Sequence, residues 1–253
     1  MLKDYISVIM ATKDPFQEFT QKAMRHLQAS TAEYELVLLN RNREWTTATI
    51  INQGLKAAVG EYILFLCDDC FVDPDTLEKL LRVLQKDEKI GMVGPTMYSP
   101  EGERKMVMGT MLCTVTPSAK TVQQGVITVR LEESDLLITP NDMGHVTGAC
   151  MMFRRSLVEE IGGYDERCIT GGGDIDFCFR AREKGYRVVW VEDTKAVHIA
   201  GATREQDKDY LNSQVDSTIL TFQMWGGSQF IPKEEKEDGT IVYTWRLLGD
   251  LRK

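Results

Sequence analysis

Short apolar runs alternate with segments of helical spacing along most of this chain. The apolar runs predict strands at residues 6–10, 34–39, 62–66, 90–95, 146–153 and 186–191. Apolar residues three and four positions apart predict helices at residues 16–28, 46–59, 155–161 and 174–184, with another beginning at residue 73. Such alternation at short intervals is typical of a mainly parallel sheet with right-handed crossovers. The pattern therefore predicts an α/β protein.

Two parts of the chain depart from this alternation. Residues 101–145 combine β-rich stretches with polar interruptions, which indicates an antiparallel or irregular insertion. Beyond residue 202 the pattern predicts a helix at residues 209–225, a charged linker at 233–238 and an edge strand at 240–247. We therefore expect one α/β domain with an insertion and a C-terminal tail.

Composition and charge exclude several classes of partner. The 253 residues are 43% hydrophobic and 27% charged, which is ordinary for a globular protein with a large core. The net charge of -8 argues against a broad electrostatic hold on nucleic acid or on an anionic membrane. A nucleic-acid partner is therefore disfavoured, although a local basic patch stays open.

The six cysteines favour a reducing compartment. They are scattered, and the N-terminal residues do not resemble a secretion signal, so we expect free thiols in the core and a cytoplasmic protein. No stretch approaches 18 consecutive apolar residues, so no membrane-spanning helix is expected, while peripheral contact with the inner membrane stays open. Cys67 and Cys70 form a single CxxC pair, which alone is weak support for a zinc or redox site.

Side chains suited to metal binding and proton transfer follow several of the predicted elements. One aspartate pair directly follows the third predicted strand, another opens the helix after three glycines, and a histidine follows the last strand of the alternation. These residues are Asp68, Asp69, Asp174, Asp176 and His198. Ligands of α/β folds bind at the carboxyl edge of the sheet, so we expect hard oxygen ligands for a cation there.

Each of these residues also has an ordinary structural interpretation. Asp68 and Asp69 could form a turn or cap a helix, and Asp174 could be a simple N-cap. A lone histidine such as His198 at the end of an apolar strand is often a structural residue. The sequence pattern alone leaves these alternatives open.

Several motifs, in order, resemble those of family 2 glycosyltransferases with the GT-A fold. They are ISVIMATKD at residues 6–14, NQGLKAAVGEYILFLCDD at 52–69, GACMMFRR at 148–155, IGGYDE at 161–166, GDIDFCFR at 173–180, VH at 197–198 and FQMWG at 222–226. The resemblance implies a Rossmann-like mixed, mainly parallel sheet flanked by helices, with an acceptor-side insertion and a C-terminal helical tail. It implies a catalytic domain at residues 1–226, in which 1–100 bind the nucleotide-sugar and 101–200 form the acceptor half, followed by a tail at 227–253.

The resemblance also implies an activity and a cofactor. A family member of this kind transfers a sugar from a nucleoside diphosphate sugar, with a UDP-sugar favoured, to an acceptor hydroxyl with inversion. Mn²⁺ or Mg²⁺, held by carboxylates, neutralises the charge that develops on the diphosphate leaving group. By position in the motifs, Asp69 and His198 would bind the metal and Asp174 would be the general base that deprotonates the acceptor.

A further set of residues is expected to bind substrate. Thr12 and Asp14 follow the first strand, where the family contacts the base, and Trp45 could stack on a base or sugar. The full expected set is Thr12, Asp14, Asn40, Trp45, Asn52, Asp68, Gly148 and Asp176. Asp176 lies two residues after Asp174, which on a helix turns its side chain away, so it is the weaker candidate for the base.

Three positions depart from the family pattern, because Cys67, Asn40 and Gly173 stand where acids are usual. These departures motivate an alternative, a catalytically inactive protein that binds nucleotide-sugars and acts as a scaffold. A nucleotidyltransferase is a second alternative, disfavoured because no Gly-rich basic phosphate loop follows the first strand. The acceptor, whether a glycan, a lipid-linked sugar or another hydroxyl compound, cannot be identified from the sequence.

Overall fold

The computed structural model describes residues 1–40, 46–102, 104–106, 112–115, 128–130, 145–169, 171–199, 220, 224, 230–235 and 241–245. The elements up to residue 106 are β1 (Leu2–Thr12), α1 (Glu18–Gln28), β2 (Tyr34–Asn40), α2 (Thr47–Ala57), β3 (Gly60–Leu66), β4 (Cys70–Val72), α3 (Thr76–Lys86), β5 (Ile90–Tyr98) and β6 (Arg104–Met106). Those that follow are β7 (Leu112–Val115), β8 (Thr128–Arg130), β9 (Cys150–Arg154), α4 (Arg155–Ile161), α5 (Gly173–Glu183), β10 (Arg187–His198), β11 (Phe230–Glu235) and β12 (Ile241–Trp245). The predicted strand–helix alternation is therefore confirmed.

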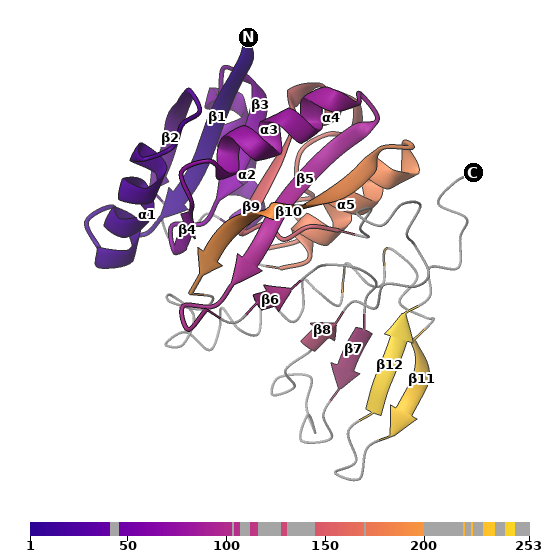
Figure 1. Ribbon diagram of the computed structural model, residues 1–253. Coiled ribbons are helices and arrows are strands. Elements are labelled where there is room, and N and C mark those ends of the chain that lie inside the picture. The colour runs from indigo at the N-terminus through magenta and orange to yellow at the C-terminus, as the bar shows by residue number, and fades with distance from the viewer. Residues whose placement is uncertain are drawn as a thin grey trace.

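The main sheet has the strand order β2-β1-β3-β9-β5-β10-β4, with β6 paired to β5 (Figure 1). β1, β2 and β3 run parallel to one another, and β5 runs parallel to β10. β9 lies antiparallel between β3 and β5, so β3 and β5 point the same way without being neighbours. The sheet is mixed, and the carboxyl ends of β1, β2, β3, β5 and β10 lie along one edge.

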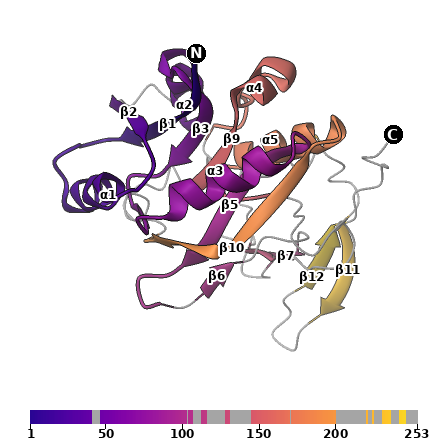
Figure 2. The ribbon, with the colours of Figure 1, turned by 45° about the horizontal axis from the view of Figure 1, so that its top comes forward.

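Helices cover both faces of this sheet, and the burial pattern of the strands explains why. In β3 the alternate residues Tyr62, Leu64 and Leu66 pack with α1 and α3, whereas Ile63 and Phe65 pack with α2, α4 and α5. A strand buried on both faces gives a continuous apolar run in the sequence. Figure 2 shows α3 crossing over β5 on its face of the sheet.

Aromatic rings fill the centre of the core between the sheet and the helices α2, α4 and α5. Phe65 of β3 makes edge-to-face contacts with Phe153 and Tyr164, at centroid distances of 5.1 and 5.3 Å. Phe177 of α5 meets Phe153 at 5.0 Å. Edge-to-face pairs are each worth about 0.5–1.5 kcal/mol beyond their buried area. This packing fixes the start of α5, which carries Asp174, against the sheet.

Three features differ from the sequence predictions. First, β4 was not predicted, and it pairs antiparallel with the end of β10. Second, β10 continues to His198, beyond the predicted end of this strand at residue 191. The third feature concerns β11. The segment predicted as a charged linker contains part of β11, which pairs antiparallel with β12. Phe230–Glu235 begins with three apolar residues and ends with three charged ones, so it shows no strand period by itself, and the strand is defined by its pairing with β12.

A second, four-stranded antiparallel sheet has the order β11-β12-β7-β8. Its strands come from the predicted insertion and from the C-terminal segment, so two regions far apart in sequence pair through β7 and β12 (Figure 1). β12 lies within the predicted edge strand, whereas the helix predicted at 209–225 lies outside the described residues except for 220 and 224, which are helical. In the described part of the chain, no helix has the length and apolar character that crossing a membrane requires.

Candidate active site

The predicted metal ligands come together at the carboxyl edge of the sheet. His198, at the end of β10, pairs with Cys70 of β4, and the next backbone amide, of Ile199, donates to the carbonyl of Asp69 at 3.1 Å. The Nε2 atom of His198 lies 3.1 Å from Oδ1 of Asp69. β4, the strand that the sequence pattern did not predict, is therefore what joins these two residues.

Cys67 completes this group. Its sulfur, an Asp69 carboxylate oxygen and a His198 ring nitrogen all lie within 4.8 Å of one another. Separations of this size are compatible with binding of one small cation, whose bonds to such atoms are about 2.0–2.3 Å long. We call Cys67, Asp69 and His198 the metal-ligand cluster.

Asp68 points away from that cluster toward α1. Its Oδ2 accepts hydrogen bonds from Gln17 Nε2 at 3.1 Å and from Thr20 Oγ1 at 3.2 Å. Burial raises the pKa of Asp68, the hydroxyl of Thr12 lowers it, and the neighbouring Asp69 carboxylate raises it. Asp68 is therefore held in position by neutral donors in a half-buried site.

The residues expected to bind the nucleobase lie at the same edge of the sheet. Thr12 is opposite Asn40 in the register of β1 and β2, and Asn40 is exposed. Thr12 and Asp14 form a tight turn, in which the Asp14 amide donates to Thr12 Oγ1 and Asp14 Oδ1 accepts from the Phe16 amide at 2.8 Å. Trp45 lies outside the described residues.

Asp174 stands at the start of α5, where two backbone amides fix its carboxylate. Oδ2 accepts from the Gly148 amide at 2.9 Å and Oδ1 accepts from the Ile175 amide at 3.0 Å. α5 follows Gly172, whose φ of +73° is a left-handed conformation that glycine adopts without strain. Gly172 therefore allows a sharp turn into the helix directly before Gly173 and Asp174.

Gly148 and Ala149 connect Asp174 to the metal-ligand cluster. The amide of Gly148 donates to Asp174, and the carbonyl of Ala149 accepts from the Cys67 amide at 2.9 Å. Two consecutive residues thus hold the candidate base on one side and a candidate metal ligand on the other. A methyl group at Gly148 would lie 3.2 Å from Cβ of Asp174, so the approach is close enough to favour glycine.

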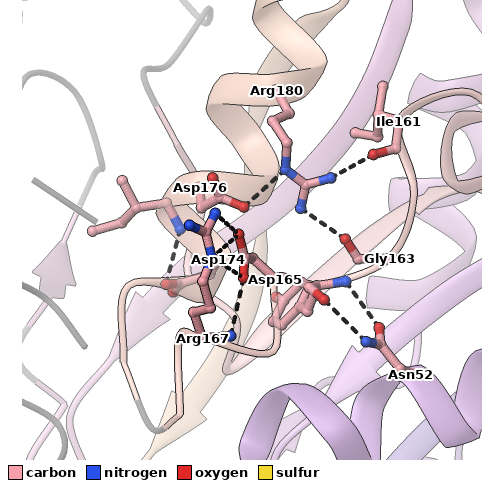
Figure 3. Close-up of polar contacts among 10 residues, drawn as sticks. Asn52, Ile161, Gly163, Asp165, Arg167, Asp174, Asp176 and Arg180 are labelled. Atoms are coloured by element: carbon pink, nitrogen blue, oxygen red, sulfur yellow. Dashed lines mark hydrogen bonds and ion pairs between the residues drawn. The ribbon is translucent and has the colours of Figure 1, made fainter. Parts of the chain in front are cut away.

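Asp176 is buried and forms an ion pair within α5. It is 1% exposed, and its Oδ2 lies 2.8 Å from Nε of Arg180, one helical turn later (Figure 3). The same guanidinium donates to the carbonyls of Ile161 and Gly163 at 2.6 and 2.7 Å. Asp176 thereby orients an arginine that holds the loop between α4 and α5.

Asn52 holds the same loop from the other side. Its Nδ2 donates to the Tyr164 carbonyl at 2.9 Å and to Glu166, and its Oδ1 accepts from the Tyr164 amide at 2.9 Å (Figure 3). A methyl group at Gly163 would lie 2.3 Å from that Oδ1. These contacts of Asn52 thus support a positioning role, and those of Asp176 do the same.

Two polar residues near Asp174 were not predicted from the sequence. His145 Nδ1 and the Tyr164 hydroxyl are buried and make no hydrogen bond within the described residues. Burial lowers the pKa of His145 while the Asp174 charge opposes this, and burial raises the pKa of Tyr164, with the Asp174 charge adding to it. Tyr164 lies within the recognised motif at 161–166, but His145 lies where no element was expected.

Comparison with known proteins identifies the family of the chain. The model of glycosyl transferase family 2 matches residues 11–162. The O-antigen biosynthesis protein RfbC of Myxococcus xanthus is 32% identical over 68% of this chain, and an N-acetylglucosaminyl-diphospho-decaprenol L-rhamnosyltransferase of Mycobacterium tuberculosis strain H37Rv is 24% identical over 64% of it. The aligned segments make up 13% and 55% of those two proteins, so the chain spans only part of each.

Solved structures share the fold at low sequence identity. The crystal structure of GalNAc-T7 with UDP, GalNAc and Mn²⁺ superposes with a TM-score of 0.63 at 12% identity, over 88% of this chain and 49% of that one. A structure of residues 1–349 of Staphylococcus aureus TarS gives a TM-score of 0.51 at 12% identity, over 88% and 73%. The main sheet with its flanking helices is thus a GT-A fold. The family model covers more than half of the chain, and the chain belongs to glycosyl transferase family 2.

Proposed function

We propose that this chain transfers a sugar from a nucleoside diphosphate sugar to an acceptor hydroxyl with inversion, in a single displacement. The observation that carries the proposal is the Gly148–Ala149 bridge, which joins Asp174 to the metal-ligand cluster through two backbone hydrogen bonds. An inverting displacement requires a base for the acceptor and charge neutralisation for the leaving group. The bridge fixes candidates for both functions relative to each other.

The residues divide the chemistry as follows. The Asp174 carboxylate accepts the proton of the acceptor hydroxyl, whose oxygen forms the new bond to the anomeric carbon. The bond from that carbon to the diphosphate breaks, and the nucleoside diphosphate leaves with the electron pair. Asp69, His198 and Cys67 would hold a divalent cation, which when bound neutralises the charge on the diphosphate.

The nucleobase of the sugar donor is proposed to lie over the edge of the sheet formed by Thr12 and Asn40. A UDP-sugar is the favoured donor, in keeping with the UDP in the GalNAc-T7 structure, although fold similarity does not fix the base. The rhamnosyltransferase relative is named for a diphospho-decaprenol acceptor, which supports testing a lipid-linked glycan as acceptor here. The five cysteines whose side chains the structure describes are not joined in disulfides, which favours a reducing compartment such as the cytoplasm.

The test compares nucleotide binding with transfer. Thermal shift with UDP-, GDP-, dTDP- and CMP-sugars, each with and without Mn²⁺, should show stabilisation by one nucleotide that requires the metal. Asp174→Asn should keep that stabilisation and reduce transfer by about 10²–10⁴-fold. Asp69→Ala should abolish the metal-dependent part of binding.

Asp193→Asn is the control, because Asp193 lies on β10 with a side chain that is 74% exposed. It should change neither binding nor transfer. Wild-type transfer by Asp174→Asn would refute the assignment of the base. Nucleotide binding without transfer to any glycan or lipid-linked acceptor would support the inactive scaffold, the alternative that the substituted acids motivate.

A further inference from the structure

Cys67 occupies the position where the family pattern has an acid, and the structure keeps it inside the metal-ligand cluster. Its backbone is fixed at both ends: the amide donates to Ala149 at 2.9 Å, and the carbonyl accepts from the Cys70 amide at 3.1 Å. This turn brings the Cys67 sulfur within 4.8 Å of an Asp69 carboxylate oxygen, although the two residues are separated by Asp68. A sulfur ligand therefore lies in the cluster at the sequence position where the family pattern has an acid.

Cys67 also differs from the other described cysteines in its exposure. Cys70, Cys150, Cys168 and Cys178 are buried, whereas Cys67 is partly exposed. Cys70, three residues on, is fully buried among core residues. Of these thiols, Cys67 alone is both accessible to an ion from solvent and grouped with an acid and a histidine, as judged over the described residues.

From this geometry we infer that the Cys67 thiolate is itself a metal ligand, which gives a sulfur, oxygen and nitrogen site that prefers Zn²⁺ or Co²⁺ to Mn²⁺ or Mg²⁺. The inference deepens the proposed function, because it concerns the cation of the same site. Thiolate and imidazole ligands suit Zn²⁺, whereas oxygen ligands suit Mg²⁺ and Mn²⁺. Three protein ligands with a free fourth position are the arrangement of catalytic zinc sites, and a diphosphate oxygen could take that position.

Metal binding converts the Cys67 thiol to a thiolate. As the sulfur–metal bond forms, the sulfur–hydrogen bond breaks and the proton passes to solvent. No electron is transferred, so neither an oxidant nor a reductant is needed. Asp69 and His198 supply the other two ligands. Their ligand atoms already lie 3.1 Å apart, so binding of the ion requires no rearrangement of the backbone.

Co²⁺ is the probe, because a thiolate bound to Co²⁺ gives a charge-transfer absorption band in the near ultraviolet. The full chain, without nucleotide, is titrated with Co²⁺ as wild type, Cys67→Ser, Cys67→Asp and Cys178→Ala. Cys178 is the matched control, because its thiol is fully buried in α5 and lies outside the cluster. Wild type and Cys178→Ala should show the band, and both Cys67 variants should lack it.

Competition between Zn²⁺ and Mn²⁺ gives the second readout. Cys67→Asp restores an oxygen ligand, so the ratio of Zn²⁺ affinity to Mn²⁺ affinity should fall by about tenfold or more relative to wild type. Circular dichroism and Tm without metal check that each variant folds. Cys67→Ser is the smallest change, and it separates loss of the thiolate from loss of the fold.

The inference would be overturned if wild type bound Co²⁺ without the band, or if Cys67→Ser kept it. Failure here is distinguishable from failure of the proposed function. Mn²⁺-dependent nucleotide binding that is unaffected by Cys67→Ser would overturn the inference and leave the transferase proposal intact. A thiolate band in a protein that binds no nucleotide-sugar would support the inference and count against the transferase.

Discussion

Removing Arg180 should unfold the loop between α4 and α5, because that side chain holds the loop and neutralises a buried acid. Asp176, its partner at 2.8 Å, is 1% exposed, and the guanidinium also donates to the carbonyls of Ile161 and Gly163. In Arg180→Met the Asp176 carboxylate stays buried and loses its ion pair with this guanidinium. The two carbonyls lose charged donors in the same substitution.

The expected cost follows from burial. Removing one partner of a buried ion pair costs about 3–5 kcal/mol, and because the Arg180 side chain is 22% exposed we expect about 3 kcal/mol. Asp176→Asn keeps an acceptor for the guanidinium and should cost less, about 1–2 kcal/mol. The double variant should be less destabilised than the sum by about 1–2 kcal/mol, since it contains no buried carboxylate that has lost the Arg180 ion pair.

Urea denaturation at pH 7 measures these costs as changes in the free energy of unfolding. Arg167→Met is the matched control, because the Arg167–Asp165 pair lies on the same loop but the arginine side chain is 66% exposed (Figure 3). An exposed pair is worth less than about 1 kcal/mol. Arg167→Met should therefore leave the midpoint nearly unchanged.

The same variants decide between two roles for Asp176. If Asp176 positions the loop, Asp176→Asn lowers stability and changes the KM for donor and acceptor little. If Asp176 binds substrate, the variant keeps wild-type stability and raises one of the KM values. Wild-type stability in both Arg180→Met and Asp176→Asn would refute the structural reasoning.

Three further predictions concern the neighbouring residues. Gly163→Ala places a methyl group 2.3 Å from Asn52 Oδ1, so it should cost about 1–3 kcal/mol in urea denaturation; full stability would mean that the amide can move freely. Gly148→Ala crowds Asp174 and should slow transfer about tenfold with nucleotide binding unchanged, whereas an unchanged rate in a steady-state assay would contradict this. Burial raises the pKa of Asp68 in the folded state above its value in the unfolded chain. Protonated Asp68 therefore contributes to stability at low pH, and this contribution is lost as the pH rises through the folded-state pKa. Without metal, Asp68→Asn should therefore raise Tm over wild type at pH 7 by more than at acidic pH, and a difference independent of pH would count against the raised pKa.

Much of the fold could be predicted because both faces of the sheet are buried. Strands covered on both sides give continuous apolar runs such as Gly60–Leu66, and those runs are visible in the sequence without any partner. β4 was missed because three residues, Cys70–Val72, are too short to show a period, and its partner lies more than a hundred residues away. β11 was missed for a similar reason, since its charged residues indicate a strand only when β12 is present.

For the site, the sequence could predict where the residues lie along the backbone, but it could not predict where their side chains point. The sequence pattern indicated that Asp69 and His198 follow strands and that Asp174 lies at the start of a helix, and the sheet topology brings Asp69 and His198 together, while the roles of all three stay predictions. It could not show that Asn52 directs its polar atoms to the backbone of Tyr164, because motif spacing does not contain contacts between groups so distant in sequence. Asp176 and Arg180 lie one helical turn apart, but the contacts of Arg180 with the carbonyls of Ile161 and Gly163 depend in the same way on the folded loop.

The three departures from the family pattern can now be weighed one by one, and they favour an active site over a degenerate one. Cys67 keeps a ligand atom in the cluster, and Asn40 lies exposed beside Thr12, where an amide can still bond a base. At Gly173 a side chain would meet the Tyr164 ring at 3.2 Å, so that ring fills the space an acid would need. A site that had lost its function would have no reason to retain the other contacts, yet the Asp69–His198 contact and the two amides on Asp174 are all present. We therefore infer that the substitutions bear on which cation and which nucleobase are bound, and the comparison of Asp174→Asn with wild type tests whether the displacement takes place.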